Sequence, residues 1–92
     1  MLYYKMSDYK ASIVSLNKVL KDYPDTKSKE MILFSLLKTK YQYAVNSVYD
    51  KRIERLNTAM DAYDELIAGF PVGEYSEEAL VIKKNILKAL NN

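Results

Sequence analysis

Hydrophobic side chains recur along this chain every three or four residues, which is the spacing of one side of an α-helix. In the segment 12–24 they are Ile13, Leu16, Leu20 and Tyr23. Only two glycines and two prolines interrupt the 92 residues, so we expect long helices joined by few turns. The pattern predicts an all-α fold whose four antiparallel helices occupy residues 8–22, 27–46, 51–69 and 75–90.

The segment 12–24, SIVSLNKVLKDYP, has a counterpart 47 residues later, AMDAYDELIAGFP at 59–71. The second copy has apolar residues at the matching positions: Met60, Tyr63, Ile67 and Phe70. Beyond the two prolines the register continues in two further pairs, Glu30 with Glu77 and Leu33 with Leu80. We interpret the two segments as copies of one structural unit, in which a helix ends at a corner and a second helix follows.

Each copy ends in an aromatic residue followed by proline. Proline has no N–H to donate and keeps the residue before it out of the α region, so the helices have to stop at Tyr23 and Phe70. We expect each aromatic ring to pack its helix end against a neighbouring helix. Thr26 and Gly73 then occupy equivalent positions near the start of the next helix, where both are acceptable capping residues.

The helix predicted at 27–46 is apolar on nearly every side because of the run MILFSLL at 31–37. Such a helix needs neighbours on two sides, as the inner layer of a helical stack provides. The helix at 51–69 instead has a narrow apolar seam, with the small residues Ala59 and Ala62 available for close approach. The seam residues are Ile53, Leu56, Met60, Tyr63, Ile67 and Phe70.

Composition excludes several classes of function. The chain has no cysteine and no histidine, which excludes disulfides, thiol nucleophiles, His-based triads and zinc sites with Cys or His ligands. We expect no cofactor, metal or catalytic residue, and no apolar run is long enough to span a membrane. Residues 1–46 have eight basic and four acidic side chains (+4), and residues 47–92 have six and eight (−2). This weak balance lacks the basic face of a nucleic-acid-binding protein.

The unit YYKMSDYKASIVSLNKVLKDYPDT resembles a tetratricopeptide repeat. In that frame YYKM resembles the end of a first helix, SDYKASI the turn into the second, and DYP the proline that ends the repeat. Residues 1–24 are then the second half of a repeat, 27–71 a complete long hairpin, and 75–90 the first helix of a further repeat. We therefore expect 1–92 to be a single helical-repeat domain with a tetratricopeptide-like α–α superhelix, and a fragment of a longer array. The period of 47 exceeds the usual ~34 residues and also fits the ~40–47 of HEAT-like repeats, but the aromatic-proline corner favours the tetratricopeptide interpretation.

Lengthened repeats that end in such a corner are similar to those of the outer-membrane assembly lipoprotein family, BamD (YfiO/ComL-like). The resemblance rests on YYKMSDYKASIVSLNKVLKDYPDT and RIERLNTAMDAYDELIAGFPVGEYSEEA. Its marker positions are Ser12, Tyr23, Pro24, Ala59, Phe70 and Pro71. The chain departs from the family pattern in having Ser12 for the usual alanine and Val72-Gly73 for a polar-serine pair. The acylated N-terminal cysteine that anchors the family is absent from these residues.

The resemblance implies a non-catalytic scaffold on the periplasmic side of the outer membrane. It would help to insert β-barrel proteins through contacts with the other subunits of their assembly machine. The alternative is a periplasmic tetratricopeptide module that binds extended peptides or coordinates cell-envelope and peptidoglycan machinery. We also expect self-association through apolar stripes on the first and last helices. Those stripes consist of Ile13 and Leu16, and of Leu80, Ile86 and Leu90.

Two polar surfaces are candidate partner-binding sites. The first is a stripe on the helix at 27–46, the type of helix that lines the groove of such repeats. It consists of Ser35, Lys38, Gln42 and Asn46, and its alternative interpretation is a solvated face. The second is the basic cluster Lys51, Arg52 and Arg55, whose alternative is local salt bridges with Asp50 and Glu54.

Two further groups of residues need an interpretation. The tyrosines near the hairpin tip either belong to an interface or fill the core with their hydroxyls at its edge. They are Tyr41, Tyr43 and Tyr49. The carboxylates of Asp61, Asp64 and Glu65 lie too close together, on an exposed helix face, to form the opposed pair of a glycosidase.

Overall fold

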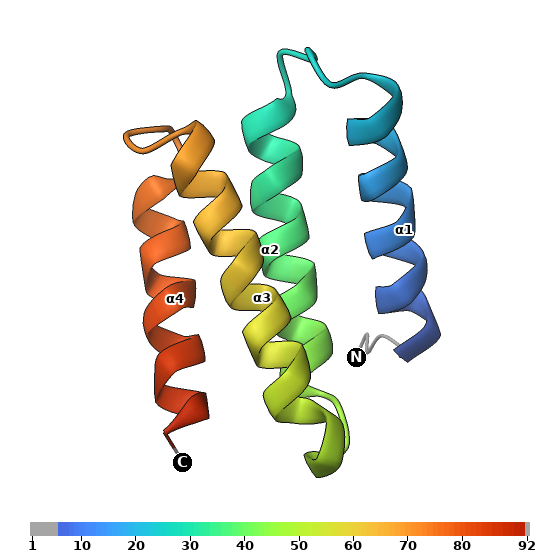
Figure 1. Ribbon diagram of the computed structural model, residues 1–92, viewed down its shortest axis with the longest axis vertical. Coiled ribbons are helices and arrows are strands. Elements are labelled where there is room, and N and C mark those ends of the chain that lie inside the picture. Colours follow the sequence, from blue (N-terminus) through green and yellow to red (C-terminus); the bar gives the residue numbers. More distant parts are fainter. Residues whose placement is uncertain (1–5, 92) are drawn as a thin grey trace, which may run out of the picture.

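The structure, a computed structural model, describes residues 6–91 and contains four antiparallel helices (Figure 1). They are α1 (Met6–Asp22), α2 (Lys29–Val45), α3 (Tyr49–Gly69) and α4 (Ser76–Leu90). No strand occurs within this part of the chain. The predicted all-α, tetratricopeptide-like fold is confirmed, and each predicted helix boundary lies within two residues of the observed one.

One local prediction at the N-terminal end is wrong. The segment SDYKASI was assigned to a turn, but α1 runs through it without a break from Met6. Asp8 in the first turn of α1 favours this start, because a negative charge there interacts with the positive end of the helix dipole. The helix end predicted at YYKM falls mostly on residues 1–5, which lie outside the described part.

The corners at 23–28 and 70–75 lie at the same end of the bundle (Figure 1) and repeat the same backbone hydrogen bonds. Three N–H···O bonds recur at an offset of 47 residues, with closely similar N···O distances. They are Tyr23–Val19 and Phe70–Leu66 (2.8 and 2.8 Å), Lys29–Thr26 and Ser76–Gly73 (3.2 and 3.3 Å), and Ile32–Ser28 and Ala79–Tyr75 (2.9 and 2.8 Å). The two proline corners therefore have the same backbone construction.

The corners differ in what satisfies the N–H of the residue just before the new helix. In the first corner the Ser28 N–H donates to Oγ1 of Thr26 at 3.2 Å. In the second, the equivalent Tyr75 N–H donates to Oε2 of Glu30 on α2, also at 3.2 Å. The prediction that Gly73 caps α4 is therefore wrong. Gly73 does not have a positive φ that would require glycine. Its role is to make room for the Glu30 carboxylate, because a Cβ at position 73 would overlap that carboxylate.

Helix α2 is the inner element of the fold, as its apolar run predicts. It packs against α1, α3 and α4, and Figure 1 shows it between α1 and the other two helices. Its side chains form the centre of a core that α3 completes with Leu56, Tyr63 and Leu66, and α4 with Ala79 and Ile86. The α2 members are Ile32, Leu33, Phe34, Leu36, Leu37 and Ala44. Each buried leucine or isoleucine contributes about 1.5–3 kcal/mol to folding.

The buried stripe of α3 is rotated relative to the predicted seam. Ile53 was expected inside but is 48% exposed, whereas Leu66, which the seam omitted, is 1% exposed. Ala59 and Ala62 are both buried, as predicted for small residues at a helix contact. Because two neighbouring helices cover α3, its apolar surface is wider than the single seam that its spacing indicated.

Helix α1 has a smaller covered surface than α3, and the marker residues reflect this. Phe70 packs against the core, but the equivalent Tyr23 is 66% exposed, so the prediction that both rings pack against a neighbour is wrong for Tyr23. Ala59 is fully buried and its counterpart Ser12 is exposed. The reason is that α3 lies against both α2 and α4, whereas α1 lies against α2 alone.

The outer face of α4 also differs from its prediction. Ile86 was expected at the surface but is completely buried, and Leu90 is half-buried. The large apolar side chains that α4 exposes are Leu80, Val81 and Leu87. On α1, Ile13 and Leu16 are half-buried, and the exposed apolar side chains are Val14 and Val19.

Candidate functional site

The predicted polar stripe follows one side of α2. Lys38, Gln42 and Asn46 are exposed, and Ser35 is half-buried. Asn46 has a structural role, because its Nδ2 donates to the Gln42 carbonyl oxygen at 2.8 Å and to the Tyr9 hydroxyl at 3.3 Å. Asn46 thus ties the C-terminal end of α2 to α1. Lys38 and Gln42 remain the accessible members of the stripe.

The basic cluster does not form the salt bridges that its spacing suggested. Within the described residues, none of its three cations has a carboxylate oxygen within 4.0 Å. Lys51 is exposed, while Arg52 and Arg55 are half-buried and turn back toward the α2–α3 loop. There Nη2 of Arg52 donates to the Ser47 carbonyl oxygen at 3.4 Å, and Nη1 of Arg55 donates to the Ser47 hydroxyl at 2.7 Å. The arginines therefore brace a turn.

Ser47 is the buried polar residue that receives these arginines. Its own hydroxyl donates to the Tyr43 carbonyl oxygen, which orients the hydroxyl oxygen toward Arg55. The Arg55 guanidinium carbon lies 4.2 Å from the centroid of the Tyr43 ring, a geometry in which the ring attracts the cation. Arg55 is thus held by two contacts, and its remaining N–H groups can still donate.

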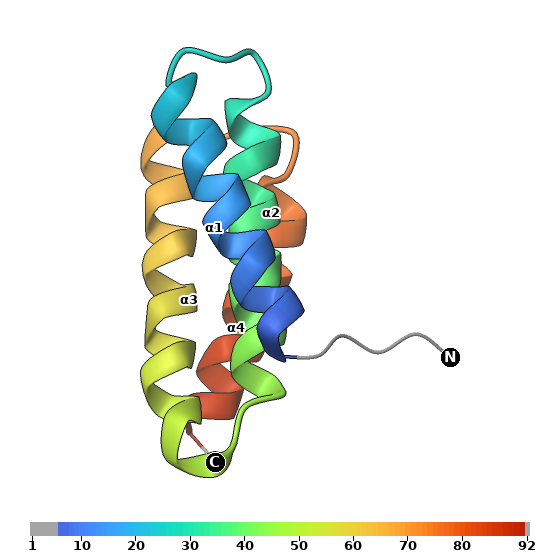
Figure 2. The ribbon, with the colours of Figure 1, turned by 90° about the vertical axis from the view of Figure 1, so that its right-hand side faces the viewer.

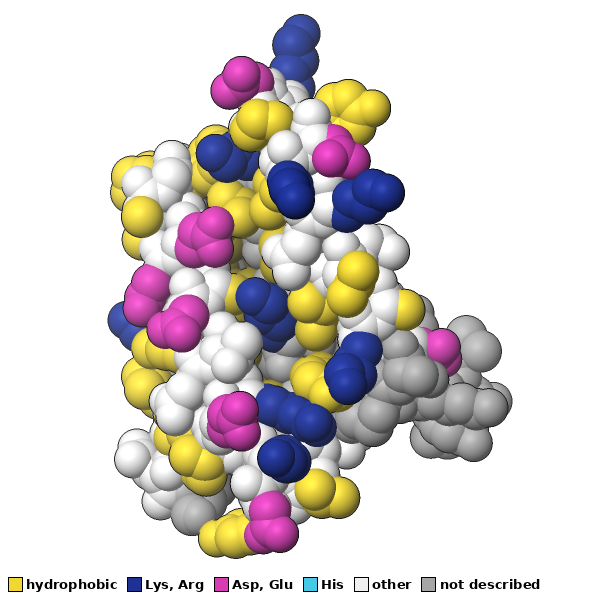
Figure 3. Space-filling model, turned by 45° about the vertical axis from the view of Figure 1, so that its right-hand side comes forward, with side chains coloured by type: hydrophobic (Ala, Val, Ile, Leu, Met, Phe, Trp, Pro, Cys, Tyr) yellow, Lys and Arg dark blue, Asp and Glu magenta, His cyan; other side chains and the backbone are white. Residues whose placement is uncertain are grey.

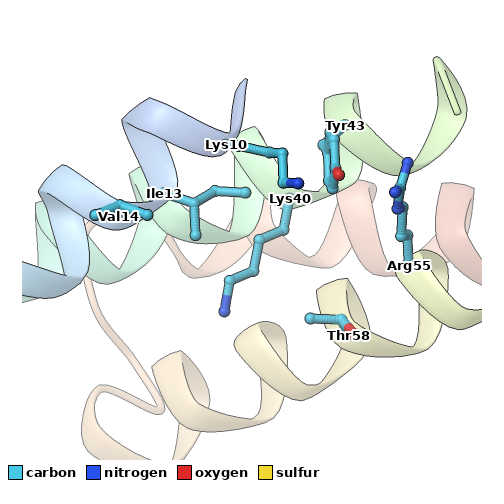
Figure 4. A pocket seen from close by; sticks show the side chains of 7 residues that line it. All are labelled: Lys10, Ile13, Val14, Lys40, Tyr43, Arg55 and Thr58. Carbon is cyan, nitrogen blue, oxygen red and sulfur yellow. The ribbon is translucent and has the colours of Figure 1, made fainter. Parts of the chain in front are cut away.

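A hollow opens between α1 and α3, on the side of α2 that both helices share. Figure 2 shows α1 tilted away from α3 on this side. Both helices pack against α2, but no Cα atom of α1 lies within 8 Å of one in α3. The space has a volume of about 260 Å³, and we call it the α1–α3 groove. Its lining comes from all three helices: Lys10, Ile13 and Val14 of α1, Lys40 and Tyr43 of α2, and Arg55 and Thr58 of α3 (Figure 4).

The α1–α3 groove is cationic and apolar, and it has no acidic lining residue. Lys10, Lys40 and Arg55 have no carboxylate partner within 4.0 Å among the described residues. Figure 4 shows Lys40 extending from α2 into the space between α1 and α3. Figure 3 shows Lys and Arg side chains gathered in and beside this hollow, with Asp and Glu side chains mostly over α3. Such a surface offers hydrogen-bond donors to carboxylates beside an apolar wall.

Of the groove residues, the sequence identified Arg55 and Tyr43 as candidate partner contacts and Ile13 as part of an apolar stripe for self-association. Lys40 had a usable signal, because it is a charged residue of α2 that lies off the face of the polar stripe. Lys10 and Val14 had none, since their importance depends on α1 and α3 lying on the same side of α2. The other tyrosines divide: Tyr41 is half-buried against the core, whereas Tyr49 is exposed.

The carboxylates that the sequence analysis considered do not line the α1–α3 groove. Asp61, Asp64 and Glu65 are exposed on α3. No group of three or more His, Cys, Asp or Glu side chains that could hold a metal ion occurs in the described part of the chain. None of the described helices combines the length and the apolar character needed to cross a bilayer.

Comparison with known proteins assigns the chain to a family. No curated protein and no solved structure matches the chain significantly. A family described as YfiO, outer membrane lipoprotein, matches residues 2–92. This agrees with the helix–corner–helix repeat, the aromatic-proline corners and the all-helical fold described above. The chain therefore belongs to the YfiO family of outer membrane lipoproteins.

Proposed function

We propose that this chain is a non-catalytic scaffold that binds other proteins, as an accessory subunit for the assembly and insertion of outer-membrane β-barrel proteins. Its place would be the periplasmic side of the outer membrane. The observation that carries the proposal is the match to the YfiO outer membrane lipoprotein family over residues 2–92. The stacked helices support it, because such repeats offer long surfaces to protein partners.

We further propose that the helices belong to successive repeats of one array. Residues 1–24 would be the second half of a repeat, 27–71 a complete hairpin and 75–90 the first helix of the next. The three hydrogen bonds that recur at an offset of 47 residues support this division. Glu77 of α4 supports it too, since it occupies the position that Glu30 has in α2, where the carboxylate accepts a hydrogen bond from the second corner.

Isothermal titration calorimetry against the purified periplasmic domains of the assembly machine tests the scaffold role. We expect saturable binding of one chain to one of these domains, in the micromolar range that is typical of modest interfaces. The control is the same titration with an unrelated tetratricopeptide protein of similar charge. Absence of binding to every domain would contradict the proposal.

A further inference from the structure

We propose that the α1–α3 groove binds an acidic segment of a partner protein, with carboxylates beside Lys10 and Lys40 and an apolar side chain between α1 and α3. This inference rests on the proposed protein-binding role and names the surface and the chemistry of the partner. It depends on three features of the groove: its unpaired cations, its apolar wall and its size.

The charge of the groove favours carboxylates. One cation comes from each of α1, α2 and α3, namely Lys10, Lys40 and Arg55, and no acidic residue lines the space. Lys40 and Arg55 are half-buried, so water screens them less than surface charges. Arg55 is already fixed by Tyr43 and Ser47, and a guanidinium held in this way loses little freedom when it binds a carboxylate.

The apolar wall and the size favour a protein segment over a small molecule. Val14 is 66% exposed and lines the groove together with Ile13 and Tyr43, which provides apolar surface that an aliphatic side chain can cover. A volume of about 260 Å³ is below the roughly 300–1,000 Å³ of small-molecule sites. It suits one or two side chains of a longer segment that lies along the groove.

The distribution of charge argues against a membrane or nucleic-acid ligand. Surfaces that bind anionic lipids present clusters of about four to eight Lys and Arg side chains, and nucleic-acid sites need a basic face that tracks a phosphate backbone. Here three cations surround a recess, and acidic side chains lie nearby on α3 (Figure 3). Because cations and apolar side chains line the groove together, it favours a ligand in which acidic and apolar groups alternate.

Fluorescence anisotropy with a synthetic peptide tests the inference directly. The probe is a labelled eight-residue peptide with two acidic residues on each side of a leucine, and the control is the same peptide with Gln and Asn in place of its Glu and Asp. We expect the acidic peptide to bind saturably and more weakly as salt rises, because screening reduces charge attraction. The neutral peptide should bind at least about tenfold more weakly.

The variants Lys40→Gln and Lys38→Gln form a matched pair. Both remove one positive charge from α2, but only Lys40 lines the groove. We expect Lys40→Gln to weaken peptide binding about threefold to fivefold, as for loss of one partly screened charge pair, and Lys38→Gln to leave it unchanged. Val14→Glu puts a carboxylate at an exposed position in the groove and should abolish binding without unfolding the chain, as circular dichroism can verify.

Several results would overturn the inference. Equal effects of Lys40→Gln and Lys38→Gln, or unaltered binding by Val14→Glu, would show that the peptide lies elsewhere. Lys40-dependent binding to phosphatidylglycerol vesicles without peptide binding would make the groove a lipid site. If the periplasmic domains bind but both groove variants, Lys40→Gln and Val14→Glu, leave their affinity unchanged, the groove proposal fails and the scaffold proposal stands. If the peptide binds in the groove and no domain binds, the scaffold proposal fails instead.

Discussion

Oε2 of Glu30 accepts a hydrogen bond of 3.2 Å from the backbone N–H of Tyr75, a residue 45 positions further along the chain. One helical turn after Glu30, the Phe34 ring stacks on the Tyr75 ring, with centroids 4.7 Å apart and planes at 16°. A single face of α2 therefore holds both the backbone and the side chain at the start of α4. This contact, which we call the Glu30–Tyr75 clamp, links the two helix–corner–helix units.

Removal of the carboxylate from the Glu30–Tyr75 clamp should destabilise the fold. In Glu30→Ala the part-buried Tyr75 N–H loses its acceptor, so we expect the free energy of unfolding to fall by about 1 kcal/mol. The matched control is Glu77→Ala, which removes the equivalent, exposed glutamate of α4 and should change stability by less than about 0.5 kcal/mol. Urea denaturation followed by circular dichroism measures both, and equal losses would contradict the role assigned to Glu30.

Gly73→Ala should depend on Glu30 for its effect. Gly73 has an ordinary backbone conformation, so alanine there would by itself stabilise by about 0.4–1 kcal/mol through the unfolded state. When Glu30 is present, the added alanine Cβ displaces the Glu30 carboxylate, and the gain in stability is offset or reversed. In a Glu30→Ala background the full gain should appear. A double-mutant cycle that gives no coupling between positions 30 and 73 would contradict this account of Gly73.

Leu33 and Leu80 occupy equivalent repeat positions but differ in burial, with 3% and 41% exposure. Leu33→Ala removes core packing between α2 and its neighbours, so we expect a loss of about 2–4 kcal/mol. Leu80→Ala should cost less than about 1 kcal/mol, because much of that side chain already contacts water. Thermal unfolding monitored by circular dichroism compares them. Similar losses at the two positions would contradict this prediction, because they would mean that Leu80 is buried as fully as Leu33.

Much of the fold follows from local sequence rules. Each X-Pro pair ends a helix at the expected residue, and the apolar run in α2 correctly indicates a helix with neighbours on several sides. The side-chain environments were harder to predict because they depend on how many helices cover each element. Spacing alone cannot tell that Phe70 packs against the core and Tyr23 is mostly exposed, or that Leu66 is buried and Ile53 is not.

The functional surface was less predictable than the fold. In the basic cluster only Lys51 and Glu54 have the i, i+3 spacing of a helix salt bridge, and Arg52 and Arg55 instead bind Ser47 in the preceding loop. The hydrogen-bond partners of the two arginines depend on the path of that loop, which the periodicity of a helix does not predict. Lys10 and Arg55, 45 positions apart, line one groove only because α1 and α3 share a side of α2.

Self-association remains a prediction, now assigned to a partly different set of residues. Leu80, Val81 and Leu87 of α4, and Val14 and Val19 of α1, are apolar and exposed, so pairing these faces would bury hydrophobic surface. We expect the isolated chain to show a mass above that of a monomer in light scattering at high concentration. Val81→Lys should shift it toward the monomer. A strictly monomeric natural chain at every concentration would count against the prediction.

Photo-crosslinking in living cells tests the central claim, a protein-binding role in outer-membrane assembly, most directly. A photoreactive amino acid replaces Lys40 in the groove, Lys38 on the polar stripe or, as a control, the exposed Asp61, and crosslinked proteins are identified by mass spectrometry. We predict that position 40 or 38 crosslinks to a subunit of the β-barrel assembly machine and that position 61 does not. Failure of both positions to crosslink to any such subunit, in cells where the protein is present and folded, would contradict the account.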